Sequence, residues 1–170
     1  MPESIALVRR VPHAAQVTLL AAVYFAAAKI SLLLAVPPGY ATAIWPPSGI
    51  ALAALLLFGR RLWPGVWLGA ALVNFTIARS LIAAVLIGTG NTLEAVAGAV
   101  LIRHFMGVPR EFRRGEDVAI FLAIAAACPI IAATVGAFPI SLSVPQGWGP
   151  VFTSWWTWWL GDATGIAFSR

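Results

Sequence analysis

The chain has 170 residues, of which 61% are hydrophobic and 10% are charged, and its mean hydropathy is +0.90. Soluble domains are about half apolar and about a quarter charged, so 11 basic and 6 acidic side chains are too few to cover a water-facing surface. The composition excludes a soluble enzyme, a disordered tail and a fibrous protein, and it indicates a polytopic membrane protein. We attribute the net charge of +5 to loop topology rather than to nucleic-acid binding.

Six apolar stretches predict an all-α fold, a bundle of membrane-spanning helices. A spanning helix needs about 20 mostly apolar residues to cross the hydrocarbon core. The first stretch follows Arg9 and Arg10, as in a signal peptide, but its length and Lys29 favour an uncleaved helix. Pro129 and Pro139 are expected to bend the fifth stretch. The predicted segments are residues 13–36, 43–59, 63–78, 80–105, 117–142 and 149–168.

The second and third stretches are short for a bilayer. A helix that begins at Pro46 reaches Gly59 after only about 21 Å, and the third stretch covers about 24 Å. Short segments broken by proline or glycine often contain non-helical backbone that lines a buried cavity. A locally thinned bilayer, or extended chain at headgroup level over residues 40–45, would explain the lengths equally well. The sequence leaves these alternatives open.

The basic residues predict the orientation of the chain. Cytoplasmic loops of membrane proteins carry an excess of lysine and arginine. With a cytoplasmic N-terminus, Arg79 alone falls in an outside loop and Lys29 falls within the first helix. Both termini are therefore predicted to lie in the cytoplasm. The residues placed inside are Arg9, Arg10, Arg60, Arg61, Arg103, Arg110, Arg113, Arg114 and Arg170.

Polar side chains at membrane depth are candidates for function, because burying them in hydrocarbon is costly. Gly90, Glu94 and Gly98 follow one another at four-residue spacing, so this face of the fourth helix is small and polar. Glu94 is therefore expected to point into the bundle. The candidates at this depth are Lys29, Asn74, Asn91, Glu94 and Asp162.

The charges in this set do not balance. Lys29 is the one cation at this depth, whereas Glu94 and Asp162 are both anions. One lysine cannot neutralise two carboxylates, so either one carboxyl is protonated or a ligand supplies the missing positive charge. The alternative is a purely structural role, in which these residues only hold the helices together.

Four tryptophans fall within five positions of the sixth stretch, in the run Trp155-Trp156-Thr157-Trp158-Trp159. Indoles that face the bundle beside Asp162 would wall a pocket for an apolar or cationic ligand. Indoles that face lipid would instead anchor the helix at the interface.

Residues typical of metal sites and hydrolytic sites are not brought together. His13 and His104 fall at helix ends, and Cys128 lies in an apolar run, where it is expected only to pack. A metal or haem within the membrane would therefore lack imidazole and thiolate ligands, and no cofactor is expected. No Ser/His/Asp set shares a depth, so we expect no enzyme.

Four motifs resemble the membrane-associated sensor domain of the MASE family, type one. They are IWPPSGIA at 44–51, with Trp45, Pro46, Pro47, Ser48 and Gly49; FGRRLWPGVWLG at 58–69; GNTLEA at 90–95; and WWLGDA at 158–163. The resemblance implies an input module of the bacterial inner membrane. In that family the module usually precedes histidine-kinase, diguanylate-cyclase or phosphodiesterase domains and is thought to regulate them, and it has no established binding residue. Members usually continue through further helices, whereas this sequence stops at Arg170, so we expect a fragment, a truncated product or a stand-alone module.

We therefore predict one membrane-embedded sensory domain over residues 1–170. Its partners are predicted to be the lipid bilayer, an unknown small ligand or a proton, and a cytoplasmic kinase or cyclase in the same or a partner chain, and not nucleic acid. A small carrier or channel, or a purely structural assembly partner, are the alternatives. The predicted ligand-binding residues are Lys29, Asn74, Asn91, Glu94, Trp158, Trp159 and Asp162.

Overall fold

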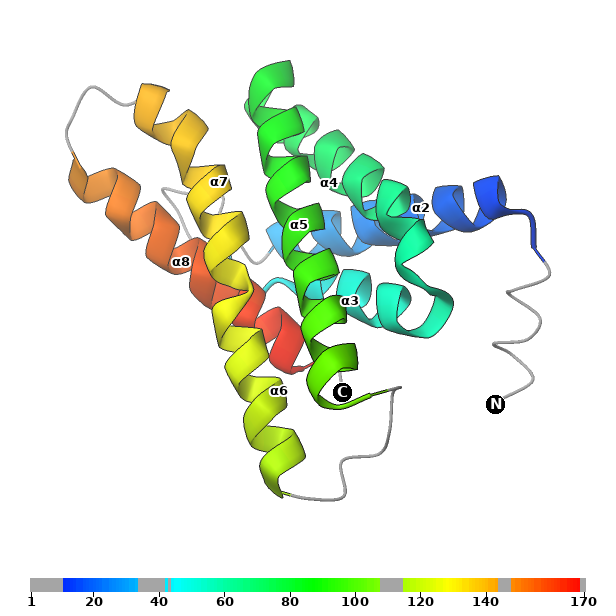
Figure 1. Ribbon diagram of the computed structural model, residues 1–170. Coiled ribbons are helices and arrows are strands. Elements are labelled where there is room, and N and C mark those ends of the chain that lie inside the picture. Colours follow the sequence, from blue (N-terminus) through cyan, green and yellow to red (C-terminus); the bar gives the residue numbers. More distant parts are fainter. Residues whose placement is uncertain (1–10, 34–41, 43, 108–114, 144–147, 169–170) are drawn as a thin grey trace.

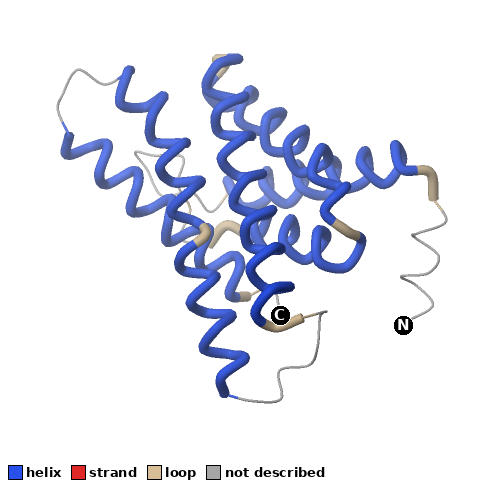
Figure 2. The backbone as a smooth tube through the Cα atoms, in the orientation of Figure 1, coloured by secondary structure: helices blue, strands red, loops and turns tan. Residues whose placement is uncertain are grey.

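A computed structural model describes residues 11–33, 42, 44–107, 115–143 and 148–168. Within these ranges the chain is helical apart from short connections, which Figure 2 draws in tan. The all-α prediction is therefore confirmed for this part of the chain. The elements are α2 (His13–Leu32), α3 (Pro46–Phe58), the 3-10 turn η1 (Arg60–Leu62), α4 (Trp63–Ala78), α5 (Leu81–Phe105), α6 (Gly115–Ala127), α7 (Pro129–Ser143) and α8 (Trp148–Ala167).

Proline, glycine and serine set the helix boundaries. Pro46 and Pro47 occupy the first turn of α3, where the missing N–H groups have no intrahelical partner in any case. Gly59 ends α3 with a φ of 105°, a conformation that glycine adopts without strain. Ser80 caps α5, because its side chain accepts a hydrogen bond of 3.3 Å from the backbone N–H of Ala83.

The fifth predicted segment is interrupted. Its helix stops after Ala127, Cys128 forms a turn, and α7 begins at Pro129. A proline inside a helix removes one backbone hydrogen bond and clashes with the preceding turn. The predicted bend at Pro129 is therefore found, as a break between two helices.

The helices pack around α5, which lies between α4 and α7 in Figure 1. On one side α4 packs against α2; on the other, α7 packs against α8, and α3 contacts both α5 and α8. The contact between α2 and α4 depends on small residues: a Cβ atom at Gly65 would lie 2.8 Å from the Val17 carbonyl oxygen, and one at Gly69 would lie 2.9 Å from that of Ala21. These backbones can approach closely only because glycine has no side chain.

Among the described residues, three helical stretches are long and apolar enough to cross a membrane: His13–Leu32, Leu81–Phe105 and the bent stretch Gly115–Phe138. α3 is also apolar but has only 13 residues, and α4 has 16. The length and composition of these helices thus support several membrane crossings. The total of six crossings stays a prediction.

Candidate functional site

α3 begins beside the interior of α8 rather than at its end. The backbone N–H of Trp45 donates a 2.9 Å hydrogen bond to the carbonyl of Gly161, and a Cβ atom at Gly161 would lie 2.6 Å from the carbonyl oxygen of Thr42. One turn further along α8, a Cβ atom at Gly165 would overlap the carbonyl of Trp45. The two glycines therefore let the non-helical chain before Pro46 pass α8 at close range, and the depth of this chain in the membrane stays a prediction.

This crossing places the first turn of α3 against a buried carboxyl. Ser48 Oγ donates a 2.6 Å hydrogen bond to Asp162 Oδ1, a contact between residues 114 positions apart. Asp162 is completely buried. The N-terminus of a helix carries a partial positive charge that stabilises a nearby anion, so both the hydroxyl and the helix end favour a carboxylate at Asp162.

The second carboxyl comes from α5. Glu94 is 1% exposed, and its side chain lies against those of Ser48 and Asp162. Glu94 Oε2 and Asp162 Oδ2 are both buried and have no hydrogen-bond partner among the described residues. Two carboxyls from different helices thus share one buried site beside α3, which packs against both α5 and α8 (Figure 1).

A tyrosine and an asparagine extend this site. Asn91 lies one turn before Glu94 on α5, and its Nδ2 donates a 3.0 Å hydrogen bond to the hydroxyl oxygen of Tyr24 on α2. Tyr24 is completely buried and interacts electrostatically with Asp162 and Glu94. We call Tyr24, Ser48, Asn91, Glu94 and Asp162 the acid cluster.

Lys29 does not join the acid cluster, so the expectation that it lies near the two carboxyls is wrong. Its Nζ atom donates a 2.7 Å hydrogen bond to Thr76 Oγ1 and lies 5.5 Å from the centre of the Phe25 ring, and the side chain is exposed. The reason is helical geometry. Lys29 follows Tyr24 by five residues, which turns it about 140° away around the helix axis.

The remaining predicted residues also lie elsewhere. Asn74 Nδ2 donates to the carbonyl of Ala70 in its own helix, at 2.9 Å. The Trp158 ring packs where Gly136 of α7 leaves room for it, and Trp159 Nε1 donates a 2.7 Å hydrogen bond to the Ala126 carbonyl. The two indoles therefore fasten α8 to α6 and α7, and they do not wall the acid cluster.

Sequence reasoning missed two members of the acid cluster. Tyr24 carried a weak signal, as one of only two tyrosines in the chain, set within an apolar helix. In the sequence, Ser48 stands out only as part of the WPPSG motif at 45–49. Its role depends on a contact with Asp162 across 114 positions, and no local pattern reports such a contact.

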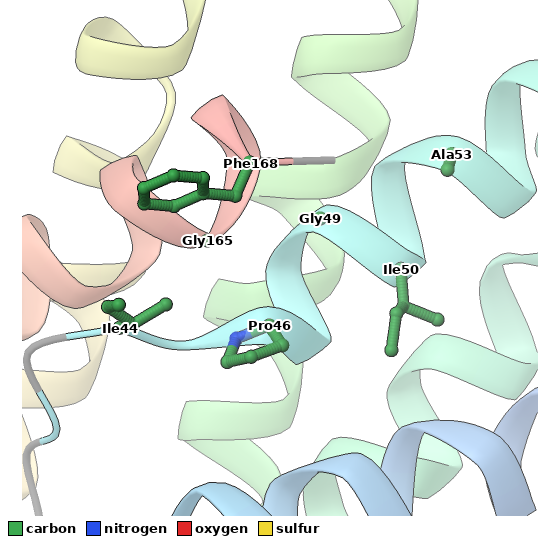
Figure 3. Close-up of a pocket in the computed structure, with 7 residues that line it drawn as sticks. All are labelled: Ile44, Pro46, Gly49, Ile50, Ala53, Gly165 and Phe168. Carbon is green, nitrogen blue, oxygen red and sulfur yellow. The ribbon is translucent and has the colours of Figure 1, made fainter. Parts of the chain in front are cut away.

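A groove of about 280 Å³ lies next to the acid cluster, between the start of α3 and the end of α8. Its walls are apolar, and none of the five acid-cluster residues lines it. Figure 3 shows the lining residues Ile44, Pro46, Gly49, Ile50, Ala53, Gly165 and Phe168.

The MASE1 family model matches residues 16–168, which include all four motifs and the entire acid cluster. The chain belongs to the MASE1 family. MASE1 is a sensory membrane domain without catalytic activity of its own. This chain is accordingly a multi-pass membrane protein. Searches of curated proteins and of solved structures gave no match. No group of three His, Cys, Asp or Glu side chains that could hold a metal occurs in the described part of this MASE1 domain.

Proposed function

We propose that this MASE1 domain is the input module of a bacterial inner-membrane signalling system. It perceives a small ligand or a proton at the acid cluster and regulates a cytoplasmic histidine kinase or cyclic-di-GMP enzyme, in the same chain or in a partner. The observation that carries the proposal is the buried contact between Glu94 of α5 and Asp162 of α8. Ionisable groups at membrane depth are costly, and they are retained mainly where they serve function.

α3 offers a mechanical connection from the acid cluster to one end of the bundle. It is a rod of 13 residues, about 20 Å long. Its first turn holds Asp162 through Ser48, and its last carbonyls, those of Leu55 and Leu56, accept hydrogen bonds of 3.1 and 2.7 Å from the Arg103 guanidinium of α5. A change in charge at one end of α3 would therefore shift its position relative to α5 at the other end.

The contacts at that end support the proposed orientation, with six membrane segments and both termini in the cytoplasm. His13 Nε2, at the start of α2, lies 3.1 Å from the backbone carbonyl oxygen of Arg61, and the Arg103 guanidinium, near the end of α5, binds the last carbonyls of α3. The start of α2 and the ends of α3 and α5 therefore meet at one end of the bundle, which supports placing Arg61 and Arg103 on the same, cytoplasmic side. Arg79 follows the opposite end of α4.

The test is a Glu94→Gln variant of the chain in its own genome, with cellular cyclic-di-GMP and histidine-kinase phosphorylation as readouts. Glutamine keeps the volume of glutamate and removes its charge, so membrane insertion is expected to persist while the output changes. Glu116→Gln is the matched control, because Glu116 is an exposed acid in the first turn of α6. A variant that lowers only the amount of protein, with no change in output per molecule, would show that the acid cluster is structural.

A further inference from the structure

The acid cluster contains two carboxyl groups and no positively charged side chain. Glu94 and Asp162 are in contact and are both buried, and no lysine, arginine or histidine of the described chain lies against them. Lys29, the cation that the sequence predicts at this depth, donates to Thr76 instead. Arg103 is engaged with the end of α3. Two adjacent carboxylates in a buried site repel each other strongly, and no cation of the described chain offsets that repulsion.

Unpaired oxygen atoms in the acid cluster indicate what the carboxyl pair can bind. Asn91 Oδ1, Glu94 Oε2 and Asp162 Oδ2 are buried oxygens without a hydrogen-bond partner within the described ranges. All three are acceptors when the carboxyls are ionised. The Ser48 hydroxyl already donates to Asp162 Oδ1, and the Asn91 amide already donates to the Tyr24 hydroxyl oxygen. Trp45 Nε1 is a buried donor without a hydrogen-bond partner in the described part of the chain. These donors leave Glu94 Oε2 and Asp162 Oδ2 unpaired, in a pair of acids whose negative charge is not offset.

We propose that the acid cluster is a binding site for a single proton, held by the Glu94 carboxyl and donated to the Asp162 carboxylate. The proton gives the carboxyl pair one O–H donor, which can join Glu94 to Asp162, and it removes one of the two negative charges. Asp162 is the anionic partner, because Ser48 and the N-terminus of α3 already favour negative charge there. The bound proton ties α5 to α8, and its loss leaves two touching anions that drive these helices apart.

The other side chains that lie near Glu94 and Asp162 bring no positive charge to them. α2 presents Tyr24 and α3 presents Ser48, neither of which carries charge in its ordinary state. Cys128, at the break between α6 and α7, is the remaining titratable group near Glu94, and it also brings no positive charge. The proton therefore has no competing cation among the described neighbours.

The inference rests on the proposed function, since it names the occupant that the sensor would perceive. The experiment is infrared spectroscopy of the full chain in lipid bilayers, which detects the carbonyl stretch of a protonated carboxylic acid directly. At neutral pH the wild type is expected to show this band, with an intensity of one acid per chain. Glu94→Gln is expected to abolish it, and Glu116→Gln is expected to leave it unchanged.

A second variant guards against misfolding. Ser48→Ala keeps both carboxyls, so the band is expected to remain but to shift in frequency, since the hydrogen bonding of Asp162 changes. A wild type without the band, or a band that survives Glu94→Gln, overturns the proposal. Stabilisation by sodium at constant pH, without a band, would assign the site to a metal cation instead.

The two proposals fail separately. A proton band together with unchanged output in Glu94→Gln would refute the sensory role and leave the proton site intact. No band together with a changed output would refute the proton site and leave the sensory role intact.

Discussion

Replacing Ser48 with alanine tests whether Asp162 is an anion. The substitution removes the 2.6 Å hydrogen bond to Asp162 Oδ1 and leaves the fully buried carboxyl without its donor. A hydrogen bond to a charged group contributes about 1.5–3 kcal/mol, whereas hydrogen bonds between membrane helices average about 0.6 kcal/mol. Ser48→Ala is therefore expected to lower the free energy of unfolding by about 2 kcal/mol. That corresponds to a loss of about 4–8 °C in Tm for a chain of this size.

The matched control is Ser31→Ala. Ser31 is equally buried, but its hydroxyl donates only to the carbonyl of Ala27 in its own helix, at 2.8 Å. That carbonyl belongs to the backbone ladder of α2 whether or not the hydroxyl is present, so the expected loss is about 0.5 kcal/mol. Both variants would be unfolded reversibly in mixed micelles and followed by helical circular dichroism. Equal small losses for the two serines would refute an anionic Asp162.

Three further variants test the contacts around the acid cluster. Gly165→Ala is expected to displace α8 from the Trp45 backbone and to destabilise the fold by about 1–3 kcal/mol, which thermal unfolding would detect; an unchanged Tm would refute the close crossing. Trp159→Phe keeps an aromatic ring but loses the donor to the Ala126 carbonyl. The free energy of unfolding is expected to fall by about 1 kcal/mol, and amide exchange at the break before α7 is expected to become faster. Unaltered amide exchange would argue against this role of Trp159. Lys29→Gln is expected to leave the output response of the acid cluster unchanged, and an altered response would restore this lysine to the site.

The helical pattern and the cost of buried charge predicted part of the site. Glycines on either side of Glu94 mark a face where another helix approaches closely, so its inward direction could be read from the sequence, and the side chain is 1% exposed. Asp162, in the middle of an apolar stretch, was found by the same reasoning. The predicted third segment, residues 63–78, has the same bounds as α4. Proline in the first turn marks its start, and the end of the apolar run marks its end.

The remaining features depend on how the helices turn against one another. Depth along a helix is readable from position, but the face that a side chain occupies is set by packing. Lys29 and Tyr24 share a helix and lie on different faces, which is why depth alone misplaced the lysine. The entry of α3 against Gly161 is a backbone contact between distant segments, and propensity carries no signal for it.

The most direct test of the account is the distance between the two carboxyl carbons in the bilayer. The chain has only 6 acidic residues, so ¹³C labelling of aspartate and glutamate carboxyls gives a spectrum simple enough to assign by solid-state NMR. The account predicts a Glu94–Asp162 cross-peak that disappears in Asp162→Asn and remains in Asp117→Asn. A spectrum in which Asp162→Asn removes no cross-peak would mean that the two acids lie apart, and the proposed sensing site would then be wrong.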